Sequence, residues 1–177
     1  MQTVLPNKRT SPLTCHGHWR NFAAWPLAHL KTYRKRIQDL LNADRSPMCW
    51  ELGHFQAPMF IQEPGETPTK PYMLVCIDTA SLAIMGNDLL RDSPSPQDLL
   101  TLLVVSIEKP FLGISAAVLP ESVHLDDPAA LELVGNELGQ LGVQVVLVKR
   151  LSALSEFEKI IERDLFSRHV GYLGGAN

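Results

Sequence analysis

The stretch SVHLDDPAALELVGNELGQLGVQVVLV, residues 122–148, decides the fold because it reads as a strand, a helix and a second strand with short connections. Asp127 followed by Pro128 is typical of a helix start, since Asp can cap free amides and Pro fits the first turn. Gly142 ends the helix, and the apolar run after it predicts the second strand. Strands joined in this way lie parallel in one sheet, with a right-handed crossover. We therefore expect a parallel β-α-β unit.

An antiparallel hairpin is expected upstream of this unit. The apolar run Tyr72–Ile77 ends at Asp78, and after a short turn Leu82–Met85 is the predicted partner strand. Two further short strands are expected, around Cys49–Leu52 and Pro58–Ile61. The sequence thus predicts an α/β fold with a mixed sheet, in which an antiparallel hairpin is followed by a parallel β-α-β unit.

Two more helices are expected in this domain. Ser95 followed by Pro96 starts a helix that is apolar on most faces, and therefore buried, as far as about Lys109. The last helix follows residue 148 and carries an apolar stripe. Ser152 and Ser155 are alternative N-caps for it.

The N-terminal segment differs in charge from the rest of the chain. Residues 1–47 contain eight Lys or Arg and two acids, a net charge of +6, whereas residues 48–177 contain eight Lys or Arg and seventeen acids, a net charge of −9. A helix is expected from Pro26, followed by a linker at residues 42–47. Its apolar stripe comprises Leu30, Tyr33, Ile37, Leu40 and Leu41. The sequence therefore divides into a basic, aromatic arm (1–47) and an α/β domain (48–177).

The arm has two interpretations. Its aromatic and basic side chains can bind a partner, including the phosphates of a nucleic acid. The residues concerned are Trp19, Trp25, Lys31, Arg34, Lys35 and Arg36. Alternatively, the arm packs by its apolar stripe on the acidic body of its own fold.

The order of elements resembles the RNase H-like fold, which includes nucleases, integrases and junction resolvases. In that fold, acids at the ends of the first and fourth strands meet and, with an acid from a helix, hold two Mg²⁺ ions that activate water. The resemblance matches Asp78 and Asp126 to the two strand acids. It leaves Glu108, Glu158 and Glu162 as candidate third ligands. The other interpretation is structural, with Asp78 as a turn former and Asp126 supporting the start of the next helix.

A second resemblance covers about residues 48–165. Its motifs are Trp50-Glu51-Leu52, Lys70-Pro71-Tyr72 before the strand to Asp78, Pro110, Pro120-Glu121 with Val123, Asp126, and Leu141-Gly142-Val143. On these motifs the sequence resembles an uncharacterised bacterial domain family. It departs from that family at Lys70, where Arg is usual, and at Leu119 before Pro120. The family has no established activity, so the resemblance implies the fold alone.

Other catalytic motifs are absent from the sequence, which has no P-loop, no G-x-S-x-G and no G-x-G-x-x-G. None of the six histidines stands at a recognisable catalytic spacing from a Ser or Cys. His54 and His124, on strand candidates, are expected to be ordinary half-buried residues and not bases. No cofactor is expected, unless Mg or Mn binds at the acids.

The remaining observations concern location and function. Three widely spaced cysteines fit a reducing cytoplasm, and no apolar run reaches the length of a membrane helix or a secretory signal. The sequence favours a cytoplasmic, non-catalytic interaction module that binds a protein partner, a second copy of itself, or nucleic acid through the basic arm. The alternative is a Mg- or Mn-dependent phosphodiesterase that uses Asp78 and Asp126.

Overall fold

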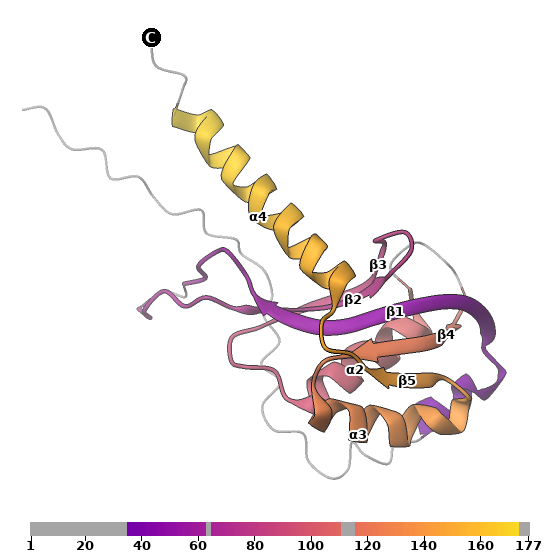
Figure 1. Ribbon diagram of the computed structural model, residues 1–177. Helices are drawn as coiled ribbons and strands as arrows, with labels where there is room; N and C mark the ends of the chain where they lie inside the picture. Colours follow the sequence, from indigo (N-terminus) through magenta and orange to yellow (C-terminus); the bar gives the residue numbers. More distant parts are fainter. Residues whose placement is uncertain (1–34, 63–64, 111–115, 174–177) are drawn as a thin grey trace, which may run out of the picture.

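The computed structural model describes residues 35–62, 65–110 and 116–173, with side chains described as far as Asp164. Residues 35–39 are helical and continue into a short 3-10 turn, η1 (Figure 1). The elements that follow the helical residues are η1 Leu40–Asn42, β1 Asp44–Gln56, β2 Tyr72–Asp78, β3 Ile84–Leu90, α2 Pro96–Glu108, β4 Val118–Leu125, α3 Pro128–Leu138, η2 Gly139–Leu141, β5 Gln144–Leu147 and α4 Ser152–Leu173.

The strands form one mixed sheet in the order β3-β2-β1-β4-β5. β2 is antiparallel to both β1 and β3, whereas β4 is parallel to β1 and β5 is parallel to β4. The expected α/β class, with a hairpin followed by a parallel β-α-β unit, is confirmed. This order and these directions are those of the RNase H-like fold that the sequence resembles.

β1 departs most from the expectation. The sequence predicts a linker at residues 42–47 and a strand at Pro58–Ile61, but β1 runs from residue 44 to residue 56 as the central strand. Residue 47, the expected end of the arm, therefore lies inside β1. Pro47 is tolerated because the β1–β4 register shifts between Ser46 and Cys49, so its missing N–H removes no paired hydrogen bond there. Ile61 makes an isolated bridge to Thr69 and no longer strand.

β3 is also longer and later than the predicted Leu82–Met85. It reaches Leu90 because it is an edge strand of the described sheet, where Asn87 and Asp88 can point to solvent without loss. The turn before it includes Leu82 with a φ of 57°. A polar edge strand has little apolar signal, and this is why the sequence prediction stopped too early.

The main core lies between the sheet and α2 with α3. Ser95 caps α2 through a capping box with Asp98, and Asp127 caps α3, as expected. Ile37 and Leu40 from the N-terminal stripe are buried in this core, which confirms that part of the stripe, whereas Leu41 is 55% exposed. Leu30 and Tyr33 lie outside the described residues.

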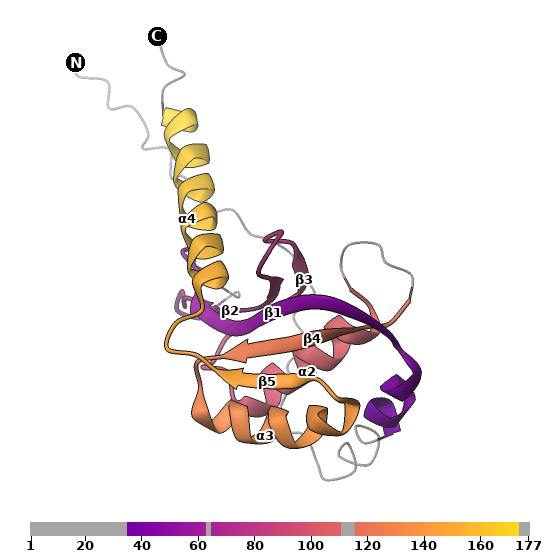
Figure 2. The same cartoon turned by 45° about the vertical axis from the view of Figure 1, so that its right-hand side comes forward.

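Among the described residues, the opposite face of the sheet is covered near the start of α4. A second apolar cluster joins Leu151, Ala153 and Leu154 to the strand residues Phe55, Val75 and Ile77. Beyond these turns α4 leaves the body of the domain and projects away from the sheet (Figure 2). Within the described residues, no helix combines the length and apolar character needed to cross a membrane.

Candidate functional site

The centre of the sheet contains a buried carboxylate, that of Glu51 in the middle of β1. Its Oε1 accepts hydrogen bonds from Ser152 N at 3.0 Å and Ser152 Oγ at 3.2 Å, and its Oε2 accepts one from Leu154 N at 2.9 Å. These amides belong to the first turn of α4, where backbone N–H groups lack partners within the helix and the helix dipole favours an anion. Glu51 therefore caps α4 from a distant strand.

This arrangement corrects the expected caps of α4. Ser152 serves as a hydrogen-bond donor to Glu51, and the Ser155 hydroxyl donates to Leu151 O at 2.7 Å. Gly53, two residues after Glu51 on the same face of β1, permits this close approach. A Cβ at Gly53 would lie 2.5 Å from Leu151 Cδ1 and 2.8 Å from Leu154 Cδ2. β1 thus fixes the start of α4 by a carboxylate and by the absence of a side chain.

Asp78, expected to be either a metal ligand or a turn former, lies at the end of β2. Its Oδ2 accepts hydrogen bonds from Ser81 N at 2.9 Å and Ser81 Oγ at 2.6 Å, so its role as a turn former is confirmed. Its Oδ1 is buried without a hydrogen-bond partner, as is Nε1 of its register partner Trp50. Asp78 therefore holds the β2–β3 turn with one oxygen.

Asp126 follows β4 and is exposed, and its neighbour Asp127 caps α3 by accepting from Ala129 N at 2.9 Å. β1 lies between β2 and β4 in the sheet. Asp78 on β2 and Val123 on β4 are both register partners of Trp50, and Asp126 follows Val123 by three residues. From strand spacing and rise, the two backbones are about 14 Å apart. The structure does not bring these two carboxylates together.

The three glutamates that were candidate third metal ligands make other contacts or lie on another element. Glu108 accepts from Arg36 Nε at 2.8 Å and from Arg36 Nη2 at 2.6 Å, a two-point ion pair between α2 and the N-terminal helical residues. Glu158 and Glu162 lie on α4, where Glu158 is half-buried and Glu162 is exposed. In the part of the chain that the structure describes, no three His, Cys, Asp or Glu side chains are grouped closely enough to hold a metal ion.

The expected partner-binding residues fall mostly outside the described residues. Trp19, Trp25, Lys31 and Arg34 all lie there. Lys35 is exposed at the first described position, and Arg36 is engaged by Glu108. For the four undescribed side chains, partner binding stays a prediction.

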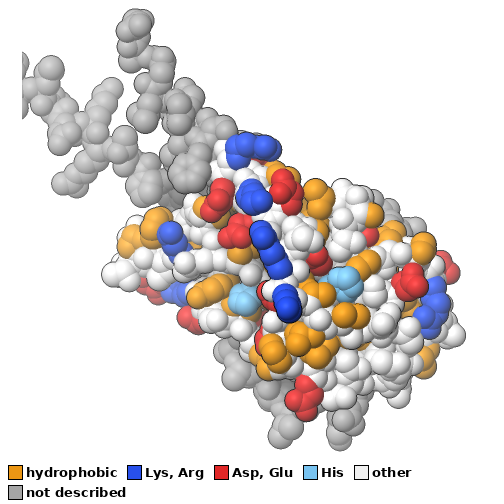
Figure 3. Space-filling view, viewed as in Figure 1, with side chains coloured by type: hydrophobic (Ala, Val, Ile, Leu, Met, Phe, Trp, Pro, Cys, Tyr) orange, Lys and Arg blue, Asp and Glu red, His pale blue; other side chains and the backbone are white. Residues whose placement is uncertain are grey.

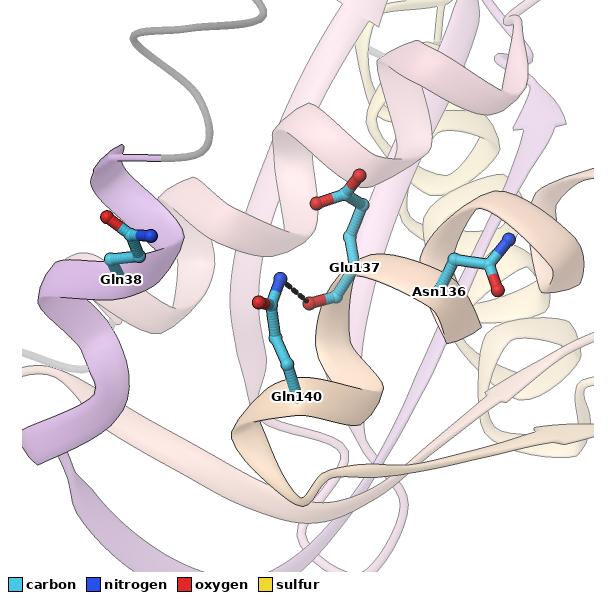
Figure 4. Close-up of a pocket in the computed structure, with 4 residues that line it drawn as sticks. All are labelled: Gln38, Asn136, Glu137 and Gln140. Carbon is cyan, nitrogen blue, oxygen red and sulfur yellow. Dashed lines mark hydrogen bonds between the residues drawn. The ribbon is translucent and has the colours of Figure 1, made fainter.

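A polar hollow of about 330 Å³ lies between the N-terminal helical residues and α3 (Figure 4). Its lining consists of Gln38, Asn136, Glu137 and Gln140, and the Gln140 side-chain amide donates to Glu137 O at 2.9 Å. Three carboxamides and one carboxylate can hydrogen-bond a polar molecule.

A different pair of side chains meets on the α4 side of the sheet, where β1 and β4 run in parallel. Cys49 Sγ lies 3.4 Å from His124 Nε2 and 3.7 Å from His124 Nδ1, and both residues are half-buried. Their separation of 75 positions in the sequence leaves no motif, so sequence analysis did not pair them. On this side of the molecule, exposed Lys and Arg form a row along α4 toward the sheet, and apolar side chains gather near the end of β5 (Figure 3).

Comparisons with known proteins give a fold likeness and a family. No curated protein sequence matches the chain. The catalytic core domain of BIV integrase has a TM-score of 0.47 at 12% identity, with 75% of each chain covered. The HTLV-2 integrase catalytic core domain in complex with magnesium has a TM-score of 0.44 at 12% identity, covering 73% of this chain and 77% of that one. A likeness this distant says nothing about activity.

The family is established from sequence. The family model described as a domain of unknown function, DUF6930, matches residues 36–162. This range contains every strand of the described sheet and the first turns of α4. Because the match spans most of the chain, the protein belongs to the DUF6930 family of domains of unknown function.

Proposed function

We propose that this domain is a non-catalytic interaction module that binds a protein through α4, and that the partner is a second copy of the chain. The observation that carries the proposal is the projection of α4 from the body (Figures 1 and 2). With 22 residues the helix is about 33 Å long. Helices in water gain most of their stability by packing an amphipathic face, so the projecting part is expected to pack on another chain.

The side chains beyond the first turns fit this role. Phe157 still packs edge to face on Phe55 of the sheet, with ring centroids 6.2 Å apart. Ile160 and Ile161, one turn further along, are half-buried apolar residues that continue this stripe at helical spacing. The exposed charged residues around them carry both signs: Glu156, Glu162 and Asp164 with Lys159 and Arg163. A surface that carries an apolar stripe and both charges can be complementary to itself, as a two-fold dimer interface requires.

The use of the carboxylates supports a non-catalytic role. Glu51 caps α4, Asp78 holds a turn and Glu108 pairs with Arg36. The alternative phosphodiesterase needs Asp78 and Asp126 at one pair of metal ions roughly 3.5–4 Å apart. Their positions on separated strands give that alternative no support.

The proposal is tested by measuring the molar mass of the full chain in solution over a range of concentrations by light scattering. We expect the wild type to dimerise as concentration rises. Ile161→Glu places a charge in the apolar stripe and should shift dimerisation to much higher concentration. Glu162→Gln, at the next position, is the control that should dimerise like the wild type.

Both variants lie past the turns that pack on the sheet, so their unfolding midpoints should match that of the wild type at concentrations where the wild type is monomeric, since dimerisation itself raises the midpoint. A chain that stays monomeric at every concentration contradicts the proposal. So does a dimer that Ile161→Glu leaves unweakened.

A further inference from the structure

The contact between Cys49 and His124 depends on the parallel pairing of β1 with β4. In this register Cys49 is opposite Ser122 and Glu51 is opposite His124, so the thiol and the imidazole are diagonal neighbours on one face. On β5 the partners of Ser122 and His124 are the uncharged Gln144 and Val146. A charged neighbour on this face is Glu51, the register partner of His124, whose carboxylate accepts hydrogen bonds from the amides of α4.

Within the described residues, both side chains of this pair are partly exposed. α4 packs over Gly53 and Phe55, on the side toward β2, and its cluster does not include Cys49 or His124. Both side chains keep part of their surface exposed. A thiol that is accessible to solvent and adjoins a base satisfies the two conditions for a nucleophilic cysteine.

Cys76 provides an internal contrast. It lies on β2, on the face that α2 covers, and its side chain is fully buried. Burial raises the pKa of the Cys76 thiol, and a hydrogen bond with Ser106 only partly offsets this. The described part of the chain therefore contains one partly exposed thiol beside an imidazole and one thiol enclosed in the core.

We propose that Cys49 is a modification site, a nucleophilic thiol activated by His124, which reacts with small soft electrophiles of the hydroperoxide class. With hydrogen peroxide, His124 takes the thiol proton and the thiolate sulfur attacks one peroxide oxygen. An S–O bond forms while the O–O bond breaks, and the imidazolium returns the proton to the departing hydroxide, which leaves as water. The products are a Cys49 sulfenic acid and water. This reaction goes beyond the proposed binding role and does not depend on it.

The test follows the alkylation rate of each cysteine in the folded full chain with iodoacetamide, resolved by peptide mass spectrometry. Near neutral pH, about 7, Cys49 should react at least about tenfold faster than Cys76. His124→Gln should slow Cys49 by on the order of tenfold at that pH. The difference should disappear above about pH 8.5, where an ordinary thiol is deprotonated without help.

His54→Gln is the matched control, because it removes a histidine from β1 that contacts Tyr72 and not Cys49. The Cys49 rate should not change in this variant. After treatment with hydrogen peroxide, a sulfenic-acid trap should label Cys49 in the wild type and less of it in His124→Gln.

The outcome is interpretable even if His124→Gln does not fold. In the wild type alone, Cys49 should react at least as fast near neutral pH in the folded chain as in the denatured chain, despite being half-buried. A slower rate in the folded chain overturns the proposal. So does a Cys49 rate that a folded His124→Gln variant leaves unchanged.

Discussion

The two faces of the sheet are built in different ways. One face is covered by α2 and α3 over a continuous apolar core. In the part of the chain that the structure describes, the other is covered by the first turns of α4, which an apolar cluster and the Glu51 carboxylate hold in place. The covered face follows from apolar periodicity along each element, whereas the other combines a smaller apolar cluster with a long-range polar contact. The larger apolar core therefore lies on one face, and the proposed sites for interaction and chemistry lie on the other.

The largest effect is expected on the covered face. Ile37 is fully buried in the main core, so Ile37→Asp places an unpaired carboxylate there. We expect a loss of about 4 kcal/mol or more in the free energy of unfolding. Chemical denaturation measures it.

Leu41→Asp is the control, since Leu41 belongs to the same predicted stripe but is 55% exposed. Its effect should stay within about 0.5 kcal/mol. Equal losses for the two variants would mean that the N-terminal residues do not pack as described.

A smaller effect is expected from Glu51→Gln on the other face. The backbone N–H groups of Ser152 and Leu154 each donate to one oxygen of the Glu51 carboxylate. In the variant, the side-chain NH2 of Gln replaces one of these oxygens, so that one of the two backbone donors would face another donor. The expected loss is about 1.5–3 kcal/mol of unfolding free energy, because charge-assisted bonds to a helix start are replaced by one neutral bond. Glu121→Gln, an exposed position on β4, is the control. An unchanged stability for Glu51→Gln would show that the contact contributes nothing.

The comparison also explains what the sequence could predict. The caps of α2 and α3 lie within three residues of the helices they serve, at Ser95 with Asp98 and at Asp127, and both were predicted. The cap of α4 comes from Glu51, 101 residues earlier, and no local signal marks it. The Cys49–His124 contact was missed for the same reason, because it depends on which strands become neighbours.

The strands show a related limit. β2 and β5 are apolar runs and were found close to their observed bounds. The first half of β1 contains Pro47 and several polar residues, and it forms a strand because it pairs with β4 around a register shift. Tertiary pairing overrides local preference there. Because the sequence interpretation did not recognise β1 as the first strand, it matched Asp78, which ends β2, to the acid at the end of the first strand.

A still smaller effect on stability is expected from the protonation of His54 on β1. Partial burial lowers the pKa of His54, although Asp126 and Asp127 oppose this shift. A lowered folded-state pKa means that the unfolded chain binds the proton more readily. The stability from His54 is therefore fully present above its ordinary value of about 6.5 and is lost as pH falls through and below it.

The unfolding midpoint of the wild type should therefore fall more than that of His54→Gln when pH is lowered from about 8 to about 5. Thermal unfolding of both proteins at each pH checks this. A larger fall in the variant would mean that the acids, and not burial, control this histidine.

The central claim is that the carboxylates of the sheet serve structure and not metal-dependent chemistry. The most direct measurement is the unfolding midpoint of the wild type, Glu51→Gln and Asp78→Asn during titration with Mn²⁺, since an ion that binds the folded state raises its midpoint. We predict that Mn²⁺ changes none of the three, and that Glu51→Gln stays below the wild type at every concentration. A rise with Mn²⁺ in the wild type that either substitution removes would contradict the account.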